Sequence, residues 1–360
     1  MRFAARGLRS GVPAGMMGRC MDRVAIDEQV DDILARALAH EGIGAADALV
    51  LLGLPLGSLE VGVLCAVADR LTRERCGGVG EVFSQVGLND ERCSLGCGFC
   101  AFGAERSGCV LSTEEAVARA VALAAAGANA VGLMATADYP FERFLTVGRA
   151  ARAALPADFP LAANVTDFGP PEAQALLAAG FTALYHVIRL REGIDSPVPP
   201  ARRRQTLLAA HAVGLDVSYC LEPIGPEHTP DELVAGVLVG EEFTPTSMAT
   251  MRRVPIAGTA LAARGEISEL AQARIQAVTT LLCARWSNLM MMGAHEPSML
   301  FLRAGANRMT AEAGGNPRDT AHETAGGRGR TVADCARMIR AAGFTLRVGP
   351  SPALQGPLRR

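Results

Sequence analysis

A repeated pattern of hydrophobic and polar positions runs along most of the chain: an alanine-rich amphipathic run, a glycine, and a short apolar segment. It occurs around Gly127, Gly180, Gly214 and Gly343. A glycine just past a helix end adopts the left-handed conformation that closes the last turn. A continuous apolar segment after that glycine is typical of a buried parallel strand. Each unit is therefore predicted to be a helix that leads into a strand.

The predicted helix starts agree with this pattern. "STEE" from Ser112 and "TPDE" from Thr229 are capping boxes, and "TVAD" from Thr331 is a weaker example. About eight strands alternating with helices fit either a doubly wound sheet or a (β/α)8 barrel, and the regular connections favour the barrel. The predicted strands lie near residues 81–88, 128–136, 160–166, 182–188, 215–221, 246–254, 287–293 and 306–312.

The fold class is therefore α/β, a TIM-type barrel with an N-terminal helical extension. We expect a disordered extension over residues 1–23, a helical lead-in over 24–75, the barrel over 76–344 and a loose proline-rich tail over 345–360. The apolar stretch 48–66 is interrupted by Pro55 and Glu60, so it is predicted to be buried helix and turn rather than a membrane span. The glycine-rich stretch 311–330 is expected to be a loop that shapes the mouth of the barrel.

Composition excludes some classes of partner. The 360 residues carry a formal charge of −2 and only 4% aromatic residues, without a long block of like charge. Nucleic acid is therefore not an expected partner, and neither is a membrane. The N-terminus lacks the sustained apolar region of a secretory signal, so ten cysteines indicate reduced thiols or metal ligands in a cytoplasmic protein.

Three of these cysteines, Cys93, Cys97 and Cys100, follow the first predicted strand, at the mouth where barrel sites are built. Zinc sites typically show paired C-x2-C spacings or nearby histidines, and this segment has neither. A 4Fe-4S cluster has four irons, so three thiolates leave one iron open to another ligand. Gly96 and Gly98 allow the loop to wrap closely round such a cluster. The spacing therefore favours a cluster with an open corner.

The segment "CSLGCGFCAF" resembles the signature of the radical S-adenosylmethionine superfamily. The resemblance implies that the open iron binds the amino and carboxylate groups of S-adenosylmethionine. It also implies that an electron, supplied by a reductant such as flavodoxin or ferredoxin, cleaves the sulfonium to a 5'-deoxyadenosyl radical. Phe99, before the third cysteine, is expected to pack close to the adenine.

Residues 45–345 resemble the biotin-synthase-like branch of that superfamily, on the lead-in, on "VPIAGTAL" and on "MLFLRAGANRMTAE". The cysteines and the arginine that hold a second, sulfur-donating cluster in biotin synthase are missing from "AVGLMAT", "PLAANVT" and "WSNLMMMGAHEP". Cys220 lies on the fifth predicted strand, about two positions away from where biotin synthase has its fifth-strand cysteine. Sulfur insertion, which would need Cys220 with Cys109 or Cys283, is thus the alternative, and a non-catalytic cluster carrier is a second alternative.

The segment "YHVIRLREG" resembles the Arg-x-Glu-type segment of the branch that contains the hydrogenase-maturation radical enzyme and methylornithine synthase. This implies that Arg189 and Glu192 hold the carboxylate and ribose of S-adenosylmethionine, with Arg191 as the competing choice. Gly132 stands where the family has its "GGE" segment, which meets the methionine amino group. Asn164, at the end of the third strand, is a further expected polar contact.

The candidate substrate residues follow later strands: Glu222 after the fifth, Arg252 and Arg253 on the sixth, His295 after the seventh, and Arg318 with Asp319 in the last loop. Strand alternation predicts that only one of the two adjacent arginines points inward. A charge inside a barrel needs a partner, so an inward arginine favours an anionic substrate. The histidine is a candidate general base.

Together these features predict a radical S-adenosylmethionine enzyme with a 4Fe-4S cluster. It is expected to abstract hydrogen from a small-molecule substrate in the biosynthesis of a cofactor or metabolite.

Overall fold

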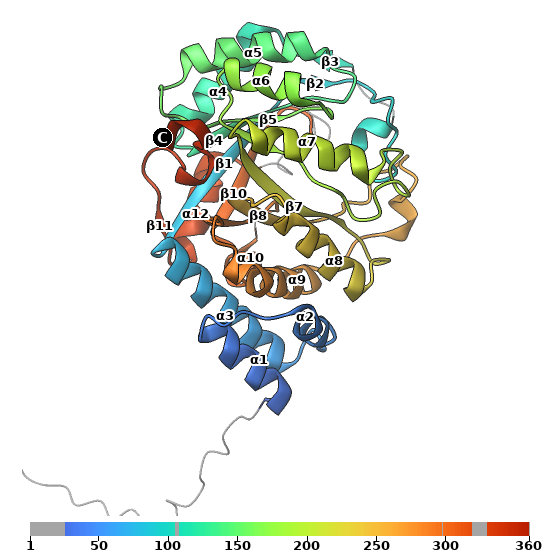
Figure 1. The fold of residues 1–360 in the computed structure, drawn as a ribbon, viewed down its shortest axis with the longest axis vertical. Helices are drawn as coiled ribbons and strands as arrows, with labels where there is room; N and C mark the ends of the chain where they lie inside the picture. Colours follow the sequence, from blue (N-terminus) through green and yellow to red (C-terminus); the bar gives the residue numbers. More distant parts are fainter. Residues whose placement is uncertain (1–25, 105–107, 297, 319–329, 360) are drawn as a thin grey trace, which may run out of the picture.

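The frame of the molecule is a set of parallel β-strands that follow one another along the chain. The computed structural model describes residues 26–104, 108–296, 298–318 and 330–359. Each barrel strand pairs in parallel with the next, and β10 pairs with β1, which closes the sheet. The predicted (β/α)8 barrel is confirmed (Figure 1). Among the described residues its eight strands are β1 (Val79–Gly87), β4 (Ala130–Met134), β5 (Leu161–Asn164), β6 (Ala183–Tyr185), β7 (Asp216–Ile224), β8 (Ser247–Arg252), β9 (Met291–Ala294) and β10 (Arg308–Ala313).

Helices cover the outside of the barrel between successive strands. The predicted capping boxes are present: the Ser112 hydroxyl accepts from the Glu115 backbone nitrogen at 3.1 Å, and that of Thr229 from the Glu232 nitrogen at 3.2 Å. Gly127 ends its helix with a φ of 98°, a left-handed conformation that favours glycine. The main outer helices are α4 (Thr113–Ala125), α5 (Phe141–Ala154), α6 (Pro170–Ala178), α7 (Pro200–Ala212), α8 (Pro230–Glu241), α9 (Glu269–Leu282) and α12 (Val332–Ala341), with the short α10 (Met299–Leu302) before β10.

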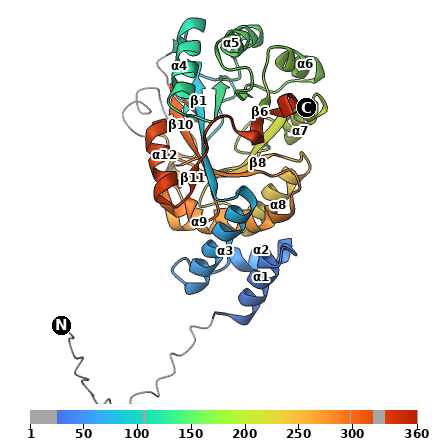
Figure 2. The ribbon, with the colours of Figure 1, turned by 90° about the vertical axis from the view of Figure 1, so that its left-hand side faces the viewer.

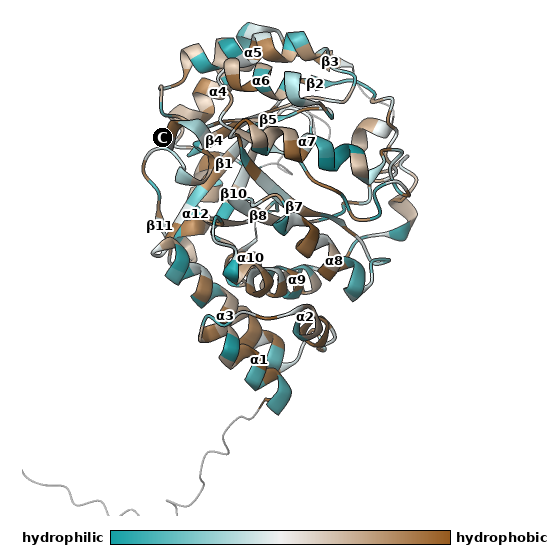
Figure 3. Ribbon diagram, viewed as in Figure 1, coloured by the Kyte–Doolittle hydropathy of each residue, from teal (hydrophilic) through white to brown (hydrophobic). Residues whose placement is uncertain are grey.

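Three helices precede the barrel: α1 (Glu28–Leu38), α2 (Ala45–Leu52) and α3 (Leu59–Cys76). They pack beneath the barrel against α9 (Figure 2), and their apolar residues join one core with that helix (Figure 3). No described helix is both long enough and apolar enough to cross a membrane. The predicted extension, residues 1–23, lies outside the described residues.

The C-terminal residues differ from the loose tail that the sequence predicts. β11 (Thr345–Leu346) pairs with β1, and the short helices η5 (Pro352–Leu354) and η6 (Gly356–Arg359) follow it. Leu354 is fully buried against alanines from β4, β5 and β6. Its carbonyl accepts from the Thr182 hydroxyl at 2.6 Å. The tail is ordered because it covers the amino ends of the barrel strands, where apolar side chains and backbone groups would otherwise face water.

A buried ion-pair network forms the floor of the barrel just inside this tail. The carboxylate of Glu81 in β1 accepts three hydrogen bonds: from Arg308 Nε at 2.8 Å, from Arg347 Nε at 3.0 Å and from the Ser351 hydroxyl at 2.7 Å. The arginine of β10 also donates to the Ser247 hydroxyl at 2.6 Å. The network closes the interior at this end, so the interior opens at the carboxyl ends of the strands.

Candidate active site

The cysteine loop follows β1 and is fastened to four other barrel loops. Backbone bonds join Gly98 nitrogen to Asp195 oxygen at 2.9 Å, Leu261 nitrogen to Gly98 oxygen at 2.9 Å, and Ala101 nitrogen to Pro317 oxygen at 2.7 Å. On the fourth side, Asp138 accepts from both the backbone nitrogen of Ser94 (2.6 Å) and its hydroxyl (2.5 Å). The loop that carries the three thiols is therefore held in place by the barrel itself.

The three thiols of this loop, from Cys93, Cys97 and Cys100, all line one cavity at the mouth of the barrel. Burial raises the pKa of Cys100 to about 12, and burial also raises the pKa of Cys97. Thiolates are the ligand form, so a bound metal group must displace these protons. A set of three thiol donors on one loop, facing one cavity, fits a 4Fe-4S cluster with one open iron.

The cavity holds about 1380 Å³ including its open mouth, and it is lined from the cysteine loop, the ends of the strands and the loop after β10. The cavity lies at the carboxyl ends of the barrel strands, where the sites of such barrels are built.

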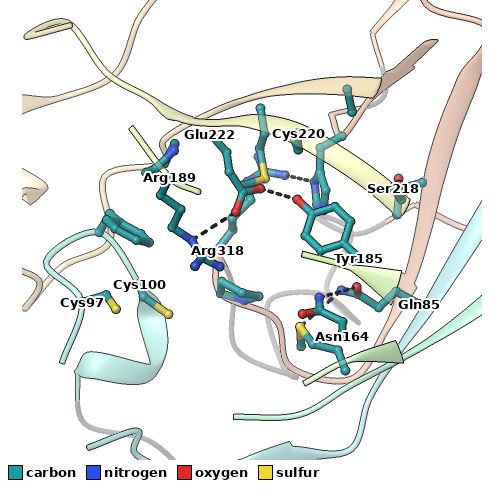
Figure 4. Close-up of a pocket in the computed structure, with 18 of the residues that line it drawn as sticks. Gln85, Cys97, Cys100, Asn164, Tyr185, Arg189, Ser218, Cys220, Glu222 and Arg318 are labelled. Atoms are coloured by element: carbon teal, nitrogen blue, oxygen red, sulfur yellow. Dashed lines mark hydrogen bonds and ion pairs between the residues drawn. The ribbon is translucent and has the colours of Figure 1, made fainter. Parts of the chain in front are cut away.

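The wall beside the cysteine loop carries an ion pair. The guanidinium of Arg189 lies 5.8 Å from the ring centre of Phe99, and its Nε lies 3.2 Å from Glu222 Oε1. On the other side, the Tyr185 hydroxyl donates to the same carboxylate (Figure 4). Burial raises the pKa of this phenol well above its ordinary value, so it stays protonated. The sequence contains no signal for Tyr185, because an aromatic residue in a short strand is typical of core.

Two of the predicted cofactor contacts need correction. The carboxylate of Glu192 is not among the groups that line the cavity. It accepts hydrogen bonds from the Ser196 hydroxyl, from Arg203 Nε at 3.3 Å and from the backbone nitrogen of Arg189 at 3.0 Å. Gly132 lies in the middle of β4, where a Cβ would stand 2.8 Å from the Phe83 ring, and it does not line the cavity.

The remaining cofactor predictions point to residues on the cavity wall. Asn164 lines the cavity and donates to Gln85 Oε1 at 3.3 Å. Arg189 lines it as well, whereas Arg191, the competing choice, does not. Arg191 lies near Asp195 and Glu232, at 3.9 and 3.8 Å. The residues of β4 that reach the wall are Met134 and those just after it.

A chain of alternating charges borders the far side of the cavity. Glu296 accepts from both Arg252 and Arg318. Nη1 of Arg318 also lies 2.8 Å from His295 Nδ1, and Nε2 of that histidine lies 3.3 Å from Glu312 Oε1. Although burial opposes ionisation, His295 and Arg318 hold the pKa of Glu312 below its ordinary value. The structure thus brings together two of the predicted substrate residues and the histidine.

The arginine contact also fixes the protonation of His295. A guanidinium only donates, so Nδ1 must accept and the proton of the neutral ring lies on Nε2, toward Glu312. Asp319, predicted to act with this arginine, lies outside the described residues.

Arg252 and Arg253 both contribute atoms to the cavity wall, and that only one of their side chains faces inward stays a prediction. β8 ends at Arg252, so strand alternation no longer governs the next side chain. Arg253 is almost fully buried, pairs with Glu227 and donates to the Gly265 carbonyl at 3.0 Å.

Comparisons with known proteins find biotin synthases among the relatives in sequence. No family model matches the sequence. A biotin synthase from Cyanothece sp. is 26% identical over 253 residues, which are 59% of this chain and 67% of that protein. One from Rippkaea orientalis is 28% identical over 184 residues, which are 47% of this chain and 49% of that protein. The chain thus spans between half and two thirds of these relatives.

Two solved structures share the fold. The crystal structure of methylornithine synthase (PylB) superposes with a TM-score of 0.76 at 17% identity, over 89% of this chain and 98% of that one. The hydrogenase maturase HydG from Carboxydothermus hydrogenoformans superposes with a TM-score of 0.72 at 15% identity, over 89% of this chain and 80% of that one.

The chain is therefore similar in sequence to biotin synthases and shares its fold with methylornithine synthase and HydG, as the resemblance of the cysteine loop leads one to expect. Enzymes of the radical S-adenosylmethionine superfamily use a 4Fe-4S cluster and S-adenosylmethionine as cofactors. The cavity and the three thiols described above are the features of this chain that fit those cofactors.

Proposed function

We propose that this enzyme cleaves S-adenosylmethionine reductively at a 4Fe-4S cluster held by Cys93, Cys97 and Cys100, and that it abstracts hydrogen from a small molecule. The observation that carries the proposal is that these three thiols, and one wall of polar and charged groups, line the same cavity. When bound, the cluster supplies the electron that converts the sulfonium into methionine and a 5'-deoxyadenosyl radical.

The residues on the cysteine side would hold the cofactor. Phe99 offers an aromatic face for the adenine, and Arg189 offers a planar pair of donors for the methionine carboxylate. The carboxylate of Glu192 is already hydrogen-bonded to buried partners such as Arg203. Glu222 therefore is the carboxylate on the cavity wall that would accept hydrogen bonds from the ribose hydroxyls. Asn164 adds a donor at the end of β5.

The residues on the far side would hold the substrate. Arg252, Arg318 and His295 stand on this rim with Glu296 as the shared counter-charge of the two arginines. Glu296, Glu312 and Glu266, which lies 3.7 Å from Arg252, offset the two guanidiniums, so an anionic group of a substrate would bind by replacing one of these carboxylates as a partner of Arg252 or Arg318. An anion that draws Arg318 toward itself would also free His295 Nδ1 to accept a proton.

The alternative, sulfur insertion, requires thiols for a second cluster. Among the described residues that line the cavity, Cys220 is the one cysteine besides the three of the loop. Cys109 is exposed on β3 (Cys109–Val110), and Cys283 is buried in the core between the barrel and the lead-in helices. A single further thiol favours hydrogen abstraction over sulfur insertion.

The test is anaerobic reconstitution with iron and sulfide, followed by an iron count and an assay for 5'-deoxyadenosine with dithionite as reductant. We expect about four irons per chain, as one such cluster requires. Cys97→Ala should lose both the iron and the 5'-deoxyadenosine, whereas Cys109→Ala, the matched control at an exposed thiol, should keep both. Six to eight irons would support sulfur insertion, and a colourless chain would remove both proposals. Flavodoxin or ferredoxin is the proposed natural reductant, and each can replace dithionite in the same assay.

A further inference from the structure

The fourth thiol of the cavity, Cys220, has no part in the cofactor site described above. It lies in β7, where Ser218, Cys220 and Glu222 line the cavity, and it also packs against the core that contains Tyr219 and Leu221. The thiol is therefore inside the barrel, on the same part of the cavity wall as Tyr185 and Glu222 (Figure 4).

The strands beside Cys220 leave room for a ligand. In the sheet register Cys220 is opposite Ala249 of β8, which is opposite Gly293 of β9. All three line the cavity, and the two neighbours are among the smallest residues. Of these three aligned residues, only Cys220 carries a functional group, and its thiol lies next to the cavity.

The surroundings of Cys220 keep its sulfur protonated. The residue is 1% exposed, and burial together with the negative charge of Glu222 raises the pKa of the thiol well above its ordinary value. A protonated thiol is a poor nucleophile, since that role needs the thiolate. What a neutral thiol offers instead is a hydrogen atom, because the S–H bond is weaker than the C–H bonds of most substrates.

We propose that the Cys220 thiol delivers a hydrogen atom to carbon-centred radicals that form in this cavity. This inference rests on the proposed function, which supplies such radicals. The S–H bond breaks and a C–H bond forms, so the carbon radical is reduced and the sulfur is left as a thiyl radical. One electron from the low-potential reductant that serves the cluster, and one proton from solvent, restore the thiol.

The first test needs no substrate. The reconstituted enzyme is equilibrated in D2O and given S-adenosylmethionine and dithionite, and the deuterium content of the 5'-deoxyadenosine is measured by mass spectrometry. Thiol protons exchange with solvent and carbon-bound protons do not, so a hydrogen taken from Cys220 arrives as deuterium. We expect one deuterium in most of the 5'-deoxyadenosine from the wild type. We expect only background label, per molecule formed, from Cys220→Ser, whose O–H bond is too strong to give the atom.

Two controls separate this source from others. Cys283→Ser removes a buried thiol that does not line the cavity and should leave the label unchanged. Tyr185→Phe removes the other exchangeable group next to Glu222 and should leave most of the label as well. Unlabelled 5'-deoxyadenosine from the wild type, full label in Cys220→Ser, or loss of label in Tyr185→Phe alone would each overturn the proposal. If no 5'-deoxyadenosine forms, the proposed function fails first and this inference with it.

A second readout uses the chain without its cofactors. The infrared difference spectrum of wild type minus Cys220→Ser at pH 8 should contain an S–H stretching band that shifts in D2O. A difference spectrum without that band would show an ionised thiol, and a band that stays in place in D2O would show a thiol that does not exchange. Either result would overturn the proposal independently of any turnover.

Discussion

Replacement of Glu81 by glutamine is the perturbation whose size the structure defines best. Glu81 is 1% exposed and is the counter-charge of both Arg308 and Arg347 in the floor of the barrel. Glu81→Gln leaves the Arg308 guanidinium buried, with only neutral partners. Breaking one partner of a buried ion pair costs about 3 to 5 kcal/mol. The same network closes the cavity floor, so its loss also loosens the interior beneath the substrate site.

The expected shift follows from the size of the chain. An unfolding entropy of about 2.1 cal/mol/K per residue over 360 residues converts 3 to 5 kcal/mol into a midpoint lowered by about 4 to 7 °C. Thermal unfolding followed by circular dichroism measures it. The matched control is Asp334→Asn, which breaks an exposed pair with Arg337 and should leave the midpoint close to that of the wild type. A midpoint for Glu81→Gln within about 1 °C of the wild type would refute the stabilising role of the floor network.

Three further results are expected. Leu354→Ala opens a cavity against the barrel and should destabilise by about 2 to 5 kcal/mol, whereas Leu358→Ala, at a 43% exposed side chain, should be close to neutral in the same thermal assay. Asp138→Ala releases one side of the cysteine loop, so a chelator should remove the cluster iron faster than from the wild type; an equal rate would contradict this role. Burial opposes ionisation of Glu227, but hydrogen bonds from Arg253 lower its pKa to about 2, from 4.5. The stability from this carboxylate is complete above pH 4.5 and is lost as the pH falls toward 2, so Glu227→Gln should flatten that decline, and an unchanged slope would argue against it.

The sequence predicts the strands and the cysteine loop because both depend on local patterns. A helix, a glycine and an apolar run recur at several barrel units, and the position of Cys93 shortly after a strand puts the loop at the mouth. The fold and the place of the site therefore follow from spacing alone.

The finer assignments depend on long-range contacts that spacing does not contain. Arg191 has a positive φ of 56°, so the chain turns there and Glu192 points to Arg203 rather than to the cavity. Leu354 is one hydrophobic residue in a proline-rich tail, and only the closed barrel shows the apolar surface that it covers. Tyr185 and Glu222 come together because β6 and β7 are neighbours in the sheet.

The central claim is that three thiols of this chain leave one corner of the cluster free for S-adenosylmethionine. Electron-nuclear double resonance on the reduced, reconstituted enzyme tests it most directly, with S-adenosylmethionine labelled with ¹⁵N in the amino group and ¹⁷O in the carboxylate. We predict that both labels couple to the cluster in the wild type. A cluster that forms fully but shows no coupling to either label would contradict the claim.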